Sequence, residues 1–333
     1  MGVIATAVVV VALDVVVWFA AHDRTPAAVA RPGGADVVAD IDASSRKVVD
    51  NVPVGRSPTL IASGFGGAWV LNKGEGTLTH IDEATRHVVA TVPLDLAASD
   101  LTVGVGGIWL VGRARGGVPQ PLESAELERI DPRTDRINRR VQTQTGAFVM
   151  AAGGNALWST GLLPGRVRGA ARSDPLTGAV RNVDIEIYGD LIAADDEAAY
   201  WVGSSASRVA RVSTRTGLLT GSLPLASDRS LAAGRVPPNP TGVVLGGGAL
   251  WISAVDGTVL RLDPQLRGIV ASIPACENAL ALTYGEGAVW VACGNGTVVR
   301  VDPKTDQAGP PIHVGGLPRG IAAGGGAVWV TLN

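Results

Sequence analysis

Short apolar and β-branched segments alternate with turns rich in Gly, Asp and Pro along most of this chain. In the first complete repeat these segments cover residues 59–63, 68–71, 77–82 and 87–92. Their lengths and side-chain types are typical of β-strands, and the Gly-rich or Asp/Pro-rich residues between them favour tight turns. The pattern predicts four short antiparallel strands per repeat, which is the unit of a β-propeller blade.

The second segment of each repeat contains a tryptophan. Residues 285–291 read Gly-Glu-Gly-Ala-Val-Trp-Val, and copies of this motif recur at intervals of about 40 residues. Seven of the eight tryptophans stand in it: Trp69, Trp109, Trp158, Trp201, Trp251, Trp290 and Trp329. A large apolar side chain at the same place in every blade is expected to pack between blades rather than to contact a ligand.

An Asp or Ser near the end of the third segment precedes a turn in each repeat, as in the run from Asp302 to Asp306. The side chain accepts backbone N–H groups, and the Pro that often follows presets φ for the turn. Acidic residues in register could also indicate calcium, but the D-x-D-x-D-G loop of a calcium site does not occur. We therefore expect these residues to cap turns, and we expect no metal site.

The order of the segments predicts how the ring closes. The chain opens with a third and a fourth strand at 37–41 and 47–54, and it ends with a first and a second strand at 320–323 and 327–332. Pairing the two ends would complete one blade and remove exposed strand edges. With six complete repeats, this composite blade predicts an all-β, seven-bladed propeller of four-stranded antiparallel blades over residues 36–333.

The repeat length varies at three places. From the Asp or Ser marker to the next tryptophan the distance is 27 residues in six of seven cases, and the exception carries an insertion at 226–240. Two further insertions, at 112–125 and 161–169, join a second strand to a third. In an up-and-down blade all three lie on one face of the ring. Because variable loops on a rigid scaffold often carry function, this face is the expected working face.

Candidate binding residues follow from counting back ten to thirteen positions from the tryptophans, where each innermost strand begins at the mouth of the channel. With the arginines of the insertions, the predicted ligand- or partner-binding residues are Arg56, Thr59, Phe148, Tyr188, Asn239, Glu277, Asn278, Arg319, Arg113 and Arg166. An arginine-rich rim could receive an anionic ligand or the carboxylates of a partner. The alternative is a solvated rim whose arginines pair with nearby acids or water.

Composition adds little chemistry. The net charge of −2 gives no electrostatic argument for nucleic acid. The four histidines form no H-x-E or H-x-x-H motif, and no G-x-S-x-G occurs, so we expect no catalytic residue and no cofactor. The two cysteines, Cys276 and Cys293, could face one another across a hairpin and form a disulfide, or remain separate buried thiols. We expect a monomer.

The N-terminus differs from the rest. Residues 3–21 are apolar except for Thr6 and Asp14, which is nearly the length needed to cross a bilayer as a helix. The alternatives are a cleaved signal peptide ending at the Ala28-Val29-Ala30 site, and a buried or disordered segment. The expected organisation is an anchor or signal segment at 1–24, a linker at 25–35 and the propeller. We expect a single-pass membrane protein with the propeller outside the cytoplasm, or a secreted protein after cleavage.

Residues 285–305 combine Gly-x-Gly-Ala-Val-Trp-Val with Val-x-Arg-Val-Asp-Pro-x-Thr, and with residues 54–58 and 314–322 they resemble the YVTN-type (YncE-like) seven-bladed propellers. The resemblance implies an extracytoplasmic module, of a kind sometimes joined through a transmembrane helix to signalling domains. The family neighbours virginiamycin B lyase, whose mouth carries a histidine and acidic residues; this sequence shows no equivalent histidine. The hypotheses are a membrane-tethered binding or sensing module, a propeller-type lyase or hydrolase, and a structural spacer.

Overall fold

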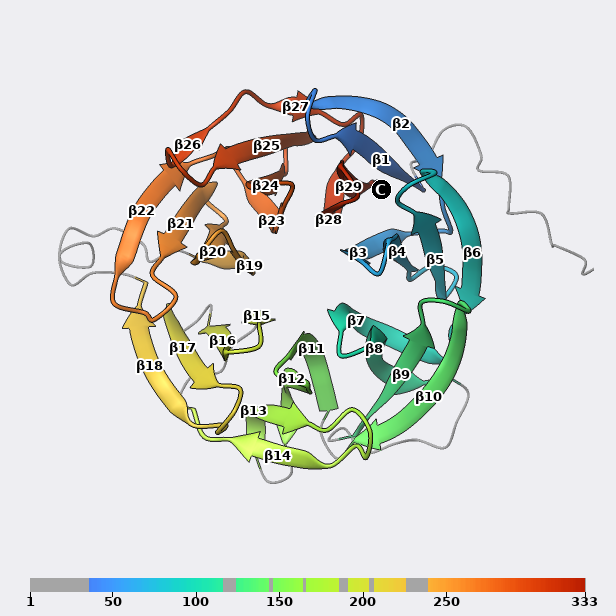
Figure 1. The fold of residues 1–333 in the computed structure, drawn as a ribbon, viewed down its shortest axis with the longest axis vertical. Helices are drawn as coiled ribbons and strands as arrows, with labels where there is room; N and C mark the ends of the chain where they lie inside the picture. Colours follow the sequence, from blue (N-terminus) through green and yellow to red (C-terminus); the bar gives the residue numbers. More distant parts are fainter. Residues whose placement is uncertain are drawn as a thin grey trace, which may run out of the picture.

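The computed structural model describes residues 36–115, 124–143, 146–163, 166–185, 191–203, 207–225 and 239–332. These residues form seven antiparallel sheets and no helix. The sheets stand side by side around a central axis, with the first strand of each blade innermost and the fourth outermost (Figure 1). The predicted all-β, seven-bladed propeller is confirmed.

The first three blades in the chain share one element order. Blade one contains β3 (Pro58–Gly64), β4 (Gly67–Asn72), β5 (Thr77–Asp82) and β6 (His87–Pro93). Blade two contains β7 (Leu96–Gly104), β8 (Gly107–Ala114), β9 (Ala125–Asp131) and β10 (Arg136–Thr143). Blade three contains β11 (Gly146–Gly153), β12 (Ala156–Leu163), β13 (Arg166–Ser173) and β14 (Val180–Val183).

The next three blades repeat this order. Blade four contains β15 (Leu191–Ala194), β16 (Ala198–Gly203), β17 (Arg208–Ser213) and β18 (Leu219–Pro224). Blade five contains β19 (Pro240–Gly246), β20 (Ala249–Ala254), β21 (Thr258–Leu262) and β22 (Ile269–Pro274). Blade six contains β23 (Ala279–Gly285), β24 (Ala288–Cys293), β25 (Thr297–Asp302) and an outer strand in two pieces, β26 (Gln307–Ala308) and β27 (Ile312–His313).

The composite blade joins the two ends of the chain, as expected. Its strand order is β28 (Pro318–Gly324), β29 (Ala327–Leu332), β1 (Val37–Asp42) and β2 (Lys47–Pro53). β29 and β1 pair antiparallel, with Ala39 opposite Val330. Backbone hydrogen bonds between the first and last strands therefore close the ring.

The Gly-x-Gly motif forms the hairpin between the first two strands of a blade. In blade one the turn residues Phe65 and Gly66 have φ values of 56° and 78°, and in blade six Glu286 and Gly287 have 52° and 69°. A two-residue turn with positive φ at both positions matches the twist of the flanking strands, and glycine adopts that conformation without steric cost. The glycines of the motif are therefore required by the hairpin turn.

The seven tryptophans of the motif are at most 1% exposed, which confirms their expected place in the core. Trp329 of the composite blade lies in one apolar cluster with Ile61, Val70 and Ile81 of blade one. In five blades the indole Nε1 donates a hydrogen bond to the glycine carbonyl five residues earlier, as Trp158 does to Gly153 at 2.9 Å. These five rings are therefore held by their own blade. Six of the seven tryptophans cluster with apolar residues of the next blade, whereas Trp201 clusters with blade three and Tyr200 packs against blade five.

The Asp residues that end the third strands cap turns, as expected. Asp42 Oδ1 accepts the N–H of Ser45 at 2.7 Å, and Asp302 Oδ1 accepts that of Lys304 at 2.8 Å. Hydrogen bonds from Ser45 lower the pKa of Asp42 to about 2, so its carboxylate is charged at neutral pH. Six of the seven marker positions carry this acid because the turn leaves backbone donors that need an acceptor.

The insertion at 161–169 differs from the expected loop. β12 continues to Leu163 and β13 starts at Arg166, so most of the extra residues lengthen a strand pair. Residues 116–123 and 226–238, which make up most of the other two insertions, lie outside the described residues.

Replacing Trp329 by alanine should lower the free energy of unfolding by about 3–5 kcal/mol, because it leaves a cavity where the composite blade meets blade one. Urea denaturation followed by circular dichroism measures this change. Val49, which is 54% exposed on β2, provides the control, and Val49→Thr should change stability by less than about 0.5 kcal/mol. Similar small losses in both variants would contradict a closing role for this tryptophan.

Candidate functional site

The innermost strands share a β-bulge near the end that faces the inserted loops. In six blades the pairing register between the first two strands shifts by one residue at the position ten before the tryptophan. The residues at these shifts are Thr59, Ser99, Phe148, Thr241, Leu280 and Arg319. A bulge adds an unpaired residue to one strand and redirects its side chain. Six blades therefore present one irregular residue each around the channel mouth.

Three predicted binding residues belong to this ring of bulges. Arg319 is exposed, and the Phe148 side chain is 47% exposed although it is aromatic. Thr59 is half-buried, and its hydroxyl donates to the carbonyl of Leu71 at 3.3 Å. The ring thus combines a cation, an exposed aromatic surface and a hydroxyl already engaged with the backbone.

Four more predicted residues lie in the loops that lead into the innermost strands. Arg56, Asn239, Glu277 and Asn278 are all exposed. The carbonyls of three of them accept a backbone N–H from the neighbouring loop of the same blade: Gly74 to Arg56 at 3.0 Å, Val255 to Asn239 at 2.9 Å and Gly294 to Asn278 at 2.7 Å. These bonds fix the rim, so its exposed side chains project from an ordered backbone.

Arg56 and Arg113 differ in their surroundings. The Arg56 guanidinium, with a side chain 71% exposed, pairs with Glu75 at 3.3 Å, which matches the alternative of a solvated rim at this position. Arg113 lies exposed near the end of β8. Tyr188 lies outside the described residues, and the side chain of Arg166 at the start of β13 does so too.

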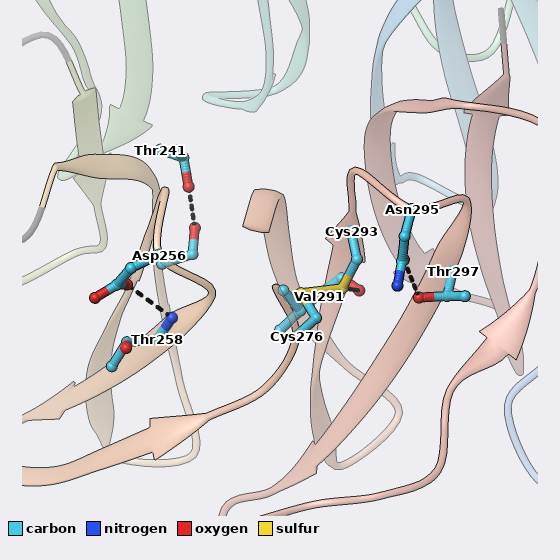
Figure 2. Close-up of a disulfide and its surroundings, with 9 residues drawn as sticks. Thr241, Asp256, Thr258, Cys276, Val291, Cys293, Asn295 and Thr297 are labelled. Carbon is cyan, nitrogen blue, oxygen red and sulfur yellow. Dashed lines mark hydrogen bonds between the residues drawn. A yellow bond between two sulfur atoms is a disulfide. The ribbon is translucent and has the colours of Figure 1, made fainter. Parts of the chain in front are cut away.

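Cys276 and Cys293 form a disulfide, shown in Figure 2. Cys276 precedes β23 and Cys293 ends β24, so the bond ties the loop carrying Glu277 and Asn278 to the second strand of the blade. The loop also packs tightly on blade five, where the N–H of Ala275 donates to the carbonyl of Gly257 at 3.0 Å. The disulfide therefore holds one sector of the rim in place.

Asp100 is a site residue that counting from the tryptophans missed. It follows the bulge at Ser99, and its carboxylate accepts the N–H of Met150 on blade three at 2.6 Å. Burial raises the pKa of Asp100 to about 6, and hydrogen bonds from the N–H groups of Met150 and Leu101, with a smaller effect from Lys73, partly offset that rise. In the sequence, Asp100 is recognisable as an acidic residue at the strand position that Leu60 and Val149 occupy in blades one and three.

The three described histidines lie on third and fourth strands, away from the innermost ring. His80 on β5 stacks on Trp69 with ring centroids 3.9 Å apart, and its Nδ1 is 2.7 Å from Asp135 of blade two. His87 begins β6, and His313 ends β27. Within the described ranges, no group of three or more His, Cys, Asp or Glu residues is arranged to hold a metal ion.

No membrane-spanning helix occurs in the part of the chain that the structure describes. The expected anchor or signal segment at 1–24 and the linker at 25–35 lie outside that part.

Comparison with known proteins shows the fold. No protein-family model matches the sequence, and no curated protein matches it. AztD from Citrobacter koseri is similar in structure, with a TM-score of 0.57 and 11% identity over 88% of this chain and 97% of that chain. Dihydro-heme d1 dehydrogenase NirN, in a complex with DHE, has a TM-score of 0.54 and 11% identity over 86% of this chain. The chain spans 66% of the length of NirN.

Replacing both cysteines by serine should lower the free energy of unfolding by about 2–4 kcal/mol, because the disulfide closes a loop of 17 residues in the unfolded chain. Urea denaturation of the oxidised wild type and of the double variant measures the difference. Adding a reductant should destabilise the wild type and leave the variant unchanged. Equal sensitivity of both proteins to reductant would contradict a stabilising disulfide.

Asp100 should make stability depend on pH. Its pKa is about 6 in the folded protein against 3.8 for a free side chain, so folding favours the protonated form. This contribution is fully present below a pH of about 4 and is lost as the pH rises through about 6. The stability of the wild type relative to Asp100→Asn should therefore fall across that window in urea titrations. A difference that stays constant with pH would contradict the assignment.

Proposed function

We propose that this propeller is a binding or sensing module that recognises a protein partner or a small ligand at the bulged mouth. The bulges in six innermost strands carry this proposal, because they direct non-repeating side chains to one end of the channel. Bulges are enriched where a strand must redirect a side chain beside a functional site. The insertions in the sequence fall on the same face, and rigid scaffolds commonly present function on such loops.

The chemistry of the mouth supports mixed polar and aromatic recognition. Arg319 brings a guanidinium able to make paired hydrogen bonds with a carboxylate or phosphate, and Phe148 brings an exposed apolar face. Lys73 lies beside the same ring, with its ammonium 3.4 Å from the carbonyl of Ser99. An occupant with an anionic group and an apolar portion fits this set best. The DHE complex of NirN supports ligand binding as a use for this fold.

The proposal places the propeller outside the cytoplasm, tethered through residues 3–21. The apolar character of that segment supports tethering, and the disulfide suits an oxidising compartment. Kinship with the YVTN-type propellers, drawn from the tryptophan and Asp-Pro motifs, stays a prediction. The lyase alternative gains no support from the described histidines, which lie on outer strands.

Replacing Arg56 and Arg319 together by alanine should abolish or strongly reduce capture of the occupant. The test uses the tagged full chain in membrane extracts, with bound proteins identified by mass spectrometry and bound small molecules by native mass spectrometry. Arg133→Ala/Arg136→Ala is the matched control, because both arginines are exposed at a turn on the opposite face and the charge change is identical. The proposal fails if both double variants capture the same molecules as the wild type.

A further inference from the structure

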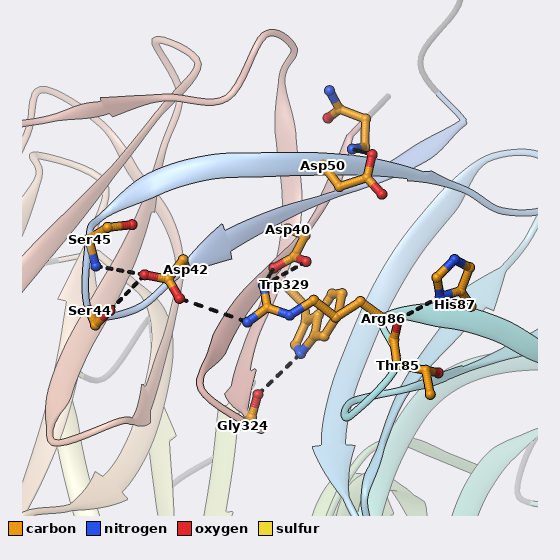
Figure 3. Close-up of polar contacts among 11 residues, drawn as sticks. Asp40, Asp42, Ser44, Ser45, Asp50, Thr85, Arg86, His87, Gly324 and Trp329 are labelled. Carbon is orange, nitrogen blue, oxygen red and sulfur yellow. Dashed lines mark hydrogen bonds and ion pairs between the residues drawn. The ribbon is translucent and has the colours of Figure 1, made fainter.

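A second site is suggested by the contacts between neighbouring blades on the face opposite the insertions. At three junctions, a third-strand side chain of one blade pairs with a turn residue of the next blade. These pairs are Asp40–Arg86 at 2.8 Å, His80–Asp135 at 2.7 Å and Arg261–Asp306 at 3.0 Å. Figure 3 shows the first, in which the Arg86 guanidinium reaches the Asp40 carboxylate beside Trp329. Each pair joins an acid to a base.

The same two positions carry like charges where blade six meets the composite blade. Arg300 on β25 lies opposite Trp290, as Arg261 lies opposite Trp251 in blade five. Arg46 holds the turn position, with a φ of 58° that matches the 56° of Asp306. This junction therefore presents two guanidinium groups at the positions where those three junctions pair an acid with a base.

These two arginines line a surface hollow of about 200 Å³. The hollow forms where Gly309, Pro310 and Pro311 interrupt the outer strand between β26 and β27, since proline has no N–H for the sheet ladder. Its remaining lining residues are Asp302, Thr305, Gln307, Ala308, Gly309 and Pro310. The break in the strand thus leaves open the space in front of Arg300.

The charges in the hollow are unbalanced. Asp302 Oδ2 lies 3.3 Å from Arg300 Nη1, and its Oδ1 accepts a backbone N–H from the turn, so this carboxylate is already engaged. Among the residues that the structure describes, Arg46 has no ion-pair partner. Two guanidinium groups and one carboxylate leave a net charge of +1 beside the hydroxyl of Thr305 and the amide of Gln307.

We propose that this hollow binds a small oxyanion, with phosphate or carboxylate oxygens held between the guanidinium groups of Arg46 and Arg300. Guanidinium groups donate paired hydrogen bonds to such oxygens, and a bound anion would relieve the repulsion between the two arginines. Thr305 and Gln307 supply further donors at the edge. The site is separate from the mouth, because it lies on the outer strands and at the opposite face.

Equilibrium dialysis of the full chain against radiolabelled inorganic phosphate tests the site, with acetate as a competitor and chloride at equal ionic strength as the background. Wild type should retain stoichiometric phosphate, and the variants Arg46→Asp and Arg300→Gln should lose it. Displacement by acetate would identify a carboxylate group as an alternative occupant, whereas resistance to acetate would identify phosphate. Arg133→Asp, the same charge change at an exposed turn of blade two, should bind as the wild type does.

Stability separates loss of the site from loss of the fold. Asp is tolerated at the left-handed turn position, where Asp135 and Asp306 have φ values of 55° and 56°. Arg46→Asp should therefore create the acid–base pairing found at three other junctions and raise the urea midpoint in chloride buffer. Phosphate should raise the midpoint of the wild type and not that of Arg46→Asp. Absence of phosphate binding by the wild type, or equal binding by all four proteins, would overturn the proposal.

Discussion

Packing of a large aromatic side chain at each junction between blades is the interaction on which the ring depends, with tryptophan at six junctions and Tyr200 between blades four and five. Trp329 touches the apolar residues of blade one, and Trp290 lies in one cluster with Ala39, Ile41 and Val328 of the composite blade. A four-stranded sheet cannot bury both of its faces alone, so each blade needs two neighbours. The composite blade supplies the second neighbour of both blade six and blade one. It forms only when the two ends of the chain pair.

Because the outer strands of the blades pack regularly, the innermost strands can carry bulges. Each bulge displaces backbone groups from the sheet ladder, and buried polar groups must find other partners. In the composite blade the hydroxyl of Thr331 accepts the N–H of Gly320 at 2.8 Å. The Asp100 carboxylate of blade two accepts the N–H of Met150 of blade three. Acceptors on the second strands and on neighbouring blades therefore satisfy these backbone N–H groups, which leaves the bulge side chains available to an occupant.

The sequence predicted the features that repeat within a blade. Tryptophan spacing, turn-capping Asp residues and incomplete repeats at the two ends were enough to predict seven blades and the composite closure. Contacts between blades were not predictable in this way. Asp40 and Arg86 are 46 positions apart, and their contact depends on how one sheet packs against the next. Asp100 was missed for the same reason, since its partner Met150 belongs to another blade. The strand-like hairpin at 161–169 was missed because spacing alone cannot distinguish a longer strand pair from a loop.

Three third-strand arginines lie over an aromatic ring of their own blade and differ in their polar partners. The guanidinium carbon lies 5.7 Å from the ring centroid of Trp158 for Arg172, 5.9 Å from that of Tyr200 for Arg211 and 5.5 Å from that of Trp251 for Arg261. The facing turn residue differs among them, being Gly217, Leu266 and Asp306. Where that residue is Leu266, Arg211 turns to Thr220 of its own blade at 2.8 Å. Where that residue is Asp306, Arg261 keeps its place over Trp251 and also pairs with the acid across the junction at 3.0 Å.

Arg300 follows none of these three arrangements. Its only ion pair among the described residues is with Asp302 on its own strand, and it faces a cation across the junction. Because the same backbone geometry recurs around the ring, the departure lies in the side chains and in the broken outer strand. Comparison of the equivalent positions around the ring therefore shows that, among the described residues, this is the junction at which two cations face each other.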